Sequence, residues 1–248
     1  MLYMLASADS IAISLILSLA LSYLAFRQGM LTARGSVAAF AVSATIGVFG
    51  SLSWLLIILT FVLAAFLTTR FKILEKAGRG LQEGKKGERG SINVIANSLP
   101  AVVISIAGFL FGRSMPHPYF AIIFITSISA AASDTLASEI GVIDSNTRLI
   151  TNLKPVTTGT DGGVSITGML AALGGALFIS LTGFLLTGWL GAPIPAWSVL
   201  LIAFLGFMGS NIDSFFGATL ERRGIIGKQI NNVASIAIVS LIAALILL

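Results

Sequence analysis

The chain has 248 residues, of which 56% are hydrophobic and only 10% are charged. Its mean hydropathy is +0.99, whereas a soluble domain carries about 25% charged residues, so the composition predicts an integral membrane protein. The chain has no cysteine and one histidine, which excludes disulfides, thiol catalysis and a multi-histidine metal site.

Apolar runs follow one another along the whole sequence, and about 20 apolar residues cross the hydrocarbon core as a helix. No Lys or Arg precedes Arg27, so the first run lacks the basic start of a secretory signal and we expect it to be retained as a span. The second and third runs are short and are separated by a weak break at 50–53, so seven spans remain the alternative to eight. We predict an all-α polytopic membrane bundle in a single domain, 1–248, with spans near 10–26, 35–50, 54–69, 92–112, 118–141, 163–188, 196–217 and 230–248.

Basic residues mark one side of this bundle. Of the 15 Lys and Arg residues, only Arg113 lies outside the loops 27–34, 70–91, 142–162 and 218–229. Cytoplasmic loops carry an excess of Lys and Arg, so we place these loops in the cytoplasm and both termini outside. We therefore interpret the net charge of +5 as basic residues that set the membrane orientation and face anionic lipid headgroups, and no nucleic-acid partner is predicted.

The loop that leads into the fourth span, 78–97, is basic and rich in glycine. Glycines let backbone N–H groups approach an anion, and Lys85, Lys86 and Arg89 could then meet phosphates. The alternative is a solvated loop held against lipid headgroups. Asn93 and Asn97, one helical turn apart just inside the bilayer, favour a polar cavity below the loop.

An acidic residue lies inside the fifth span, in the stretch 128–141. A carboxylate near the middle of a bilayer costs about 2.5–3.5 kcal/mol, which makes Asp134 a functional candidate. Ala130, Ser138 and Gly141 share its helical face, so other helices can approach closely there. Glu139 lies on another face, and we treat it as a secondary candidate.

The loop 154–163 also runs into a predicted helix, and its side chains and glycines suit an anion as well as a helix cap. It lacks the spacing of a Walker loop, so that mechanism is not assigned. Helix capping with a flexible connection is the alternative to phosphate binding. The phosphate-binding candidates here are Lys154, Thr158, Gly159, Asp161 and Gly162.

A second acid, Asp213, lies in the seventh span on a face that it shares with Gly206, Ser210 and Gly217. We therefore expect Asp134 and Asp213 to form two halves of one inward-facing site. Mg²⁺ is typically held by one or two carboxylates together with substrate phosphates, and phosphoryl transfer needs mainly positioning and charge neutralisation. Buried acids that fix helix packing, or that bind a coupling cation in a transporter, are the alternatives.

Four motifs resemble an integral-membrane family that was long labelled as one of unknown function. This family includes transmembrane protein nineteen and the phytyl-phosphate kinase of tocopherol synthesis. The segment D-x-x-A-S-x-x-G at 134–141 is also similar to an element of dolichol kinase and of CTP-dependent lipid cytidylyltransferases. The chain departs from the family pattern after Ala218, where it is compact, so no role is assigned to 220–228. The motifs are GERGS at 87–91 with Asn97, SDTLASEIG at 133–141, KPVTTGTDGGVS at 154–165 and GSNIDSFFGA at 209–218.

The resemblance implies a kinase of the cell membrane that uses CTP or another nucleoside triphosphate. Its acceptor would be an isoprenyl monophosphate, such as phytyl or geranylgeranyl phosphate, and its product the diphosphate. A CTP:lipid-phosphate cytidylyltransferase and a cation-coupled transporter remain the alternatives, and a homo-oligomer is compatible with the sequence. On this hypothesis Asp134, Asp213 and Glu139 are catalytic and the first two hold Mg²⁺, while the phosphate-binding residues are Arg89, Asn93, Asn97, Lys154, Thr158, Gly159, Asp161 and Gly162.

Overall fold

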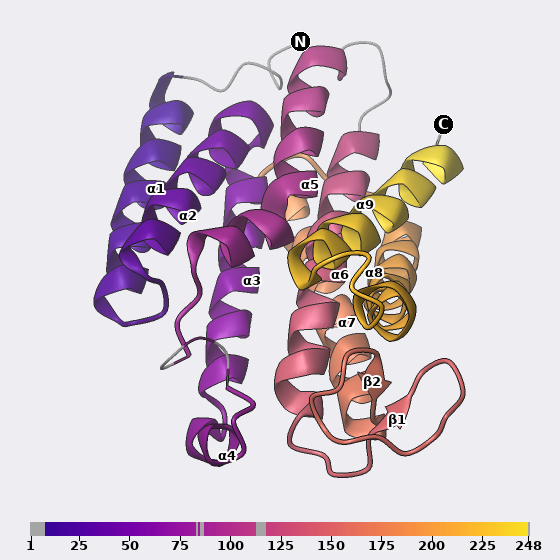
Figure 1. Cartoon of the computed structure of the whole chain (residues 1–248). Helices are drawn as coiled ribbons and strands as arrows, with labels where there is room; N and C mark the ends of the chain where they lie inside the picture. The colour runs from indigo at the N-terminus through magenta and orange to yellow at the C-terminus, as the bar shows by residue number, and fades with distance from the viewer. Residues whose placement is uncertain (1–7, 83, 85–86, 113–117, 248) are drawn as a thin grey trace.

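The computed structural model describes residues 8–82, 84, 87–112 and 118–247. Over these residues, eight helices are long and apolar enough to cross a membrane, which confirms the predicted all-α bundle and its count of eight spans. The start of α1 and the end of α9 lie at one end of the bundle, as an even number of spans requires (Figure 1). The helices are α1 (Ala8–Arg27), α2 (Ala33–Thr45), α3 (Leu52–Arg70), α4 (Ile73–Gly78), α5 (Ser91–Phe111), α6 (Tyr119–Gly141), α7 (Ile166–Trp189), α8 (Trp197–Phe216) and α9 (Lys228–Leu247).

Two π-helical turns extend the membrane helices. The turn Ile46–Gly50 continues α2, and Ser51 then caps α3 by accepting a hydrogen bond from the backbone N–H of Trp54. The weak break between the second and third predicted spans is therefore a true helix boundary. The turn Gly217–Glu221 likewise continues α8 and carries its last residues beyond the predicted end of the seventh span.

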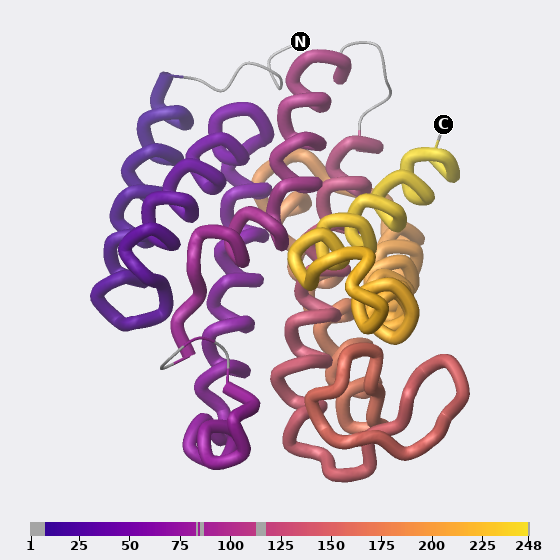
Figure 2. The backbone as a smooth tube through the Cα atoms, viewed as in Figure 1, coloured from indigo at the N-terminus to yellow at the C-terminus, as the bar shows by residue number. Residues whose placement is uncertain are grey.

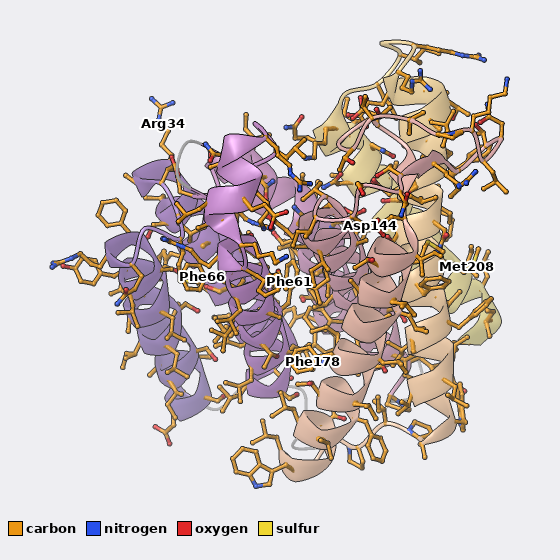
Figure 3. All side chains as sticks on the ribbon, turned by 90° about the horizontal axis from the view of Figure 1, so that it is seen from below. Arg34, Phe61, Phe66, Asp144, Phe178 and Met208 are labelled. Atoms are coloured by element: carbon orange, nitrogen blue, oxygen red, sulfur yellow. The ribbon has the colours of Figure 1, made fainter. Side chains whose placement is uncertain are left out.

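Helix α6 is the centre of the bundle and packs against α3, α5, α7, α8 and α9. In its hydrophobic window 78% of the residues are buried, whereas no other candidate span exceeds 44%. Trp54 of α3 stacks on Phe124 of α6 with ring centroids 4.4 Å apart. Phe61 lies among the helices, while Arg34 projects away from them (Figure 3).

Small residues set how closely α7 and α8 approach α6. A Cβ atom on Gly209 would lie 2.7 Å from the Cβ of Ala130, and one on Gly141 would lie 3.2 Å from the Cα of Gly168. These contacts involve the small-residue face of α6 on which Asp134 lies. The face therefore brings α7 and α8 against α6 on either side of the acid.

A short hairpin covers the end of the bundle opposite the chain ends. Strand β1 (Arg148–Leu149) pairs antiparallel with β2 (Gly163–Val164), and the connecting segment loops around the ends of α6 and α7 (Figure 2). The sixth span was predicted to begin at 163, but these residues belong to the hairpin. Helix α7 begins at Ile166, because Ser165 caps it by accepting a hydrogen bond from the N–H of Gly168 at 3.1 Å.

Candidate functional site

A cavity of about 360 Å³ lies beside the hairpin, between the adjoining ends of α6, α7, α8 and α9. Residues 80–82 and the loop 158–163 complete its wall. The cavity is therefore built from segments that are far apart in sequence. Its ionisable side chains are Asp134, Glu139, Asp161, Asp213, Glu221 and Lys228.

Asp134 of α6 and Asp213 of α8 meet in this cavity, with their carboxyl groups in hydrogen-bond contact. The hydroxyl of Ser235 in α9 donates to Oδ1 of Asp213 at 3.3 Å. Two carboxyl groups this close either share a proton, so that only one is ionised, or are both ionised around a bound cation. The structure thus brings together the two acids that the sequence analysis paired, in an arrangement that suits a divalent cation.

The glycine-rich loop 158–163 forms a second wall of the cavity. Gly159 has a φ of +86° and Gly162 a φ of +74°, a region that side chains disfavour. A Cβ atom on Gly162 would also collide with Ala218. The backbone N–H groups of Thr158, Gly159 and Asp161 donate to no backbone acceptor within the part of the chain described here, which leaves them available to an anion.

Asp144 fixes this loop to the start of α7. Its backbone carbonyl accepts a hydrogen bond from the hydroxyl of Thr158 at 3.2 Å. Its carboxylate accepts hydrogen bonds from the backbone N–H of Asn146 at 2.9 Å and from the hydroxyl of Thr167 at 2.8 Å. These hydrogen bonds, first that of Asn146 and then that of Thr167, lower the pKa of Asp144 below its ordinary value.

Glu139 lines the cavity, but its carboxylate is held by a buried ion-pair network. Oε2 accepts a hydrogen bond from the Lys76 ammonium at 2.7 Å, and Oε1 accepts one from the Thr69 hydroxyl at 2.6 Å. Arg89 approaches Oε1 at 3.5 Å. The side chains of Lys76 and Glu139 are only 1% and 7% exposed. Both carboxylate oxygens are thus engaged by protein donors, unlike those expected of a metal ligand.

Two of the four cations predicted to meet phosphates, Arg89 and Lys154, are not among the described residues that line the cavity. Arg89 joins the Glu139 network and is close enough to Asp134 to interact with it electrostatically. Lys154 is exposed in the hairpin connection, where its backbone N–H donates to the side-chain oxygen of Asn152. Lys85 and Lys86 fall outside the described residues.

The amide pair of α5 forms a buried bridge between helices instead of lining the cavity. The Asn97 side-chain N–H donates to the backbone carbonyl of Asn93 at 2.9 Å and to its side-chain oxygen at 3.2 Å. Asn232 of α9 donates to Oδ1 of Asn97 at 3.3 Å. This chain of amides connects α5 to the helix that carries Ser235 toward Asp213.

Comparison with known proteins assigns the chain to a family. The family described as integral membrane protein DUF92 matches residues 16–244. The chain belongs to this family. The resemblance predicted from its four motifs is thereby confirmed. No solved structure matches the chain.

Relatives from distant organisms are identical to this chain at about a third of the aligned residues. An uncharacterized membrane protein of Methanocaldococcus jannaschii is 32% identical over 200 residues, which are 80% of this chain and 78% of that protein. The chloroplastic protein VTE6 of Arabidopsis thaliana is 32% identical over 223 residues, 87% of this chain and 65% of VTE6. Protein PGR of the same plant is 30% identical over 229 residues, 85% of this chain and 79% of PGR.

The two aspartates form a donor set that a divalent cation could share with further oxygen ligands. Among the described residues, no group of three or more His, Cys, Asp or Glu side chains is placed to hold a metal ion. Asp134 and Asp213 alone would leave several coordination positions to water and substrate. That is how Mg²⁺ is usually bound beside phosphates, whereas a dedicated protein cage would supply more ligands.

Four polar residues at this site were not singled out as site candidates in the sequence. Glu221 and Lys228 line the cavity, and Ser235 contacts Asp213. The side-chain N–H of Asn231 donates to the backbone carbonyl of Asp213 at 3.0 Å and to Glu221 at 3.2 Å. For the three in α9 the signal was the spacing of residues 228, 231 and 235, which places three polar side chains on one face of a membrane helix; Glu221 had no such signal.

Proposed function

We propose that this protein is a membrane kinase that transfers the γ-phosphoryl group of CTP, or of another nucleoside triphosphate, to an isoprenyl monophosphate. The observation that carries the proposal is the contact between Asp134 and Asp213 in a cavity of about 360 Å³. Two ionised carboxylates in contact require a cation, and a cation held by so few protein ligands requires further oxygens. Substrate phosphates would supply those oxygens.

The proposed reaction needs little acid–base catalysis from the protein. An oxygen of the acceptor monophosphate attacks the γ-phosphorus, the bond to the β-phosphate oxygen breaks, and a nucleoside diphosphate leaves. The attacking oxygen is already anionic, so no strong general base is needed. Bound Mg²⁺ would neutralise charge that develops on the phosphates. Asp134 and Asp213 would hold it, while the N–H groups of residues 158, 159 and 161 would orient the phosphates.

Membrane topology supports the direction in which the site opens. The cavity lies at the end of the bundle that carries α4 and the hairpin, with the basic loops 70–91 and 142–162 (Figure 1). From the positive-inside rule we expect this end to face the cytoplasm, where nucleotides are abundant. A prenyl tail could then remain in hydrocarbon while its phosphate enters the cavity. The motif resemblance to phytyl-phosphate kinase supports the substrate class.

The test is product identification with purified protein in detergent. The protein is incubated with Mg²⁺, CTP and geranylgeranyl phosphate, and the mass of the lipid product is determined by mass spectrometry. We expect a gain of one phosphate. Asp134→Asn and Asp213→Asn should each lower turnover by about 10²–10³-fold, because each weakens charge neutralisation worth several kcal/mol. Asp9→Asn makes the same chemical change on the exposed start of α1 and should leave turnover unchanged.

Other products or no product would contradict the proposal in different ways. A gain of CMP with release of pyrophosphate would identify a cytidylyltransferase, in which the lipid phosphate attacks the α-phosphorus. Absence of turnover with every prenyl phosphate and nucleotide tested, together with cation-dependent uptake into vesicles, would favour the transporter. Chelation of Mg²⁺ should abolish turnover, and added Mg²⁺ should restore it.

A further inference from the structure

The first two turns of α9 present a polar face to the end of α8. Lys228, Asn231 and Ser235 follow one another at intervals of three and four residues, so they lie on one side of the helix. Lys228 lines the cavity, Asn231 contacts Asp213 and Glu221, and Ser235 donates to the Asp213 carboxylate. The polar face of α9 therefore reaches the cavity at Lys228 and contacts its acids through Asn231 and Ser235.

The charges in the cavity are unbalanced. Its lining contains five acids, and among the described lining residues Lys228 is the one basic side chain. Glu139 is compensated by Lys76, and a divalent cation would compensate the pair of aspartates. Asp161 and Glu221 then leave a net negative wall that repels phosphates. A phosphate-binding site here needs a protein cation, and Arg89 and Lys154 are not part of the lining.

We propose that Lys228 binds phosphate groups in this cavity and is its principal protein cation for a polyphosphate ligand. This inference rests on the proposed function for the nature of the ligand. Lys228 is close enough to Asp134, Asp213 and Glu221 to interact electrostatically with each of them. A phosphate held by the two aspartates through a cation therefore lies within range of its ammonium group.

The position of Lys228 suits this task in two further respects. Its side chain is exposed, so it can change rotamer and follow a ligand into the cavity without losing buried packing. Its backbone is held in place because the next turn of α9 is tied to α8 by Asn231, which is itself 1% exposed. An exposed ammonium group on a fixed helix end is placed where a phosphate in the cavity can reach it.

The test measures binding of inorganic triphosphate in the presence of Mg²⁺, by the shift in thermal unfolding of the full chain in detergent. We expect Lys228→Gln to bind triphosphate about 10–100-fold more weakly, because that is the loss that corresponds to one charged hydrogen bond to phosphate. Lys228→Arg keeps the charge and should bind within about threefold of the original protein. Arg223→Gln is the matched control, because it removes one positive charge from an exposed residue of the connection just before α9 that does not line the cavity.

The outcomes separate this inference from the proposed function. The inference is supported if Lys228→Gln binds triphosphate more weakly while Lys228→Arg and Arg223→Gln do not, and if its unfolding midpoint without ligand is unchanged. This holds even if no kinase product forms. Equal binding by Lys228→Gln and the original protein overturns it, although turnover may be intact in both. A fall in the unliganded midpoint without a change in affinity shows a structural role and also overturns it. Failure of the original protein to bind triphosphate overturns it as well.

Discussion

Replacing Lys76 by Met tests whether Glu139 supports the fold or serves the chemistry. The ammonium of Lys76 donates to the Glu139 carboxylate at 2.7 Å, to the backbone carbonyl of Thr68 at 3.0 Å and to that of Glu139 at 3.4 Å. All three of its donors are thus used. Met has a similar volume and shape, so the substitution removes the charge and leaves little cavity.

The expected loss follows from the charge that stays behind. Removing one partner of a buried ion pair typically costs about 3–5 kcal/mol, because the other charge is left uncompensated. Arg89 remains 3.5 Å from Oε1 of Glu139, and Thr69 still donates to that oxygen. We therefore expect a loss near the lower limit, about 3 kcal/mol.

The double variant Lys76→Met, Glu139→Gln supplies the matched comparison. It removes both charges, so it should recover most of the stability lost in Lys76→Met and unfold within about 1–2 kcal/mol of the original protein. Stability is measured by reversible denaturation in mixed micelles. Turnover is measured on the folded fraction, where the double variant should retain activity if Glu139 acts only through packing.

Two results would refute this reasoning. A loss below about 1 kcal/mol in Lys76→Met would show that the pair does not stabilise the bundle. A double variant that is stable but inactive would show that Glu139 takes part in the chemistry, as the sequence analysis predicted. Only the latter result would restore Glu139 to the catalytic set.

The remaining predictions concern packing, pH and metal. Gly206→Ala should destabilise the bundle by about 1–3 kcal/mol, because the new Cβ would lie 2.8 Å from the Cβ of Ser129. Gly174→Ala, which meets no atom within 4 Å, should cause no destabilisation, because Ala is favoured over Gly inside a helix by up to about 1 kcal/mol. The hydrogen bond from Asn146 lowers the pKa of Asp144 in the folded protein. The ionised Asp144 carboxylate therefore stabilises the fold above the unfolded-state pKa of about 3.9, and this stabilisation is lost as the pH falls through the lower pKa of the folded state. The difference in unfolding midpoint between the original protein and Asp144→Asn should therefore shrink below pH 4, and a constant difference would contradict this. Isothermal titration with CTP should show no binding after removal of Mg²⁺, and metal-independent binding would count against the proposed cation site.

Hydropathy and the cost of buried charge made much of this protein predictable. The spans near 92–112 and 118–141 differ from α5 and α6 by at most one residue at either end, because the bilayer requires helices of a set length. Asp134 and Asp213 were recognisable because a carboxylate within an apolar helix needs a reason to be there. Small residues on the same helical faces indicated that other helices could approach these acids.

Residues at the ends of the spans were harder to interpret. Glu221 and Lys228 resembled ordinary charges of a cytoplasmic loop, and only the π-helical turn after α8 and the direction of α9 bring them to the cavity. Lys154 had the right chemistry but lies in an exposed connection. The two-residue strands of the hairpin are too short for any periodic signal.

The amino-acid sequence by itself determined the membrane class, the family and the two acids at the centre of the site, because each depends on local hydropathy or on a contiguous motif. The tertiary structure alone decided which charges share the cavity. It paired Glu139 with Lys76, 63 residues earlier in the chain, and placed Lys228 beside the aspartates. Such pairings depend on how helices cross and how loops fold back. No local sequence pattern predicts which side chains, distant in sequence, will meet in this way.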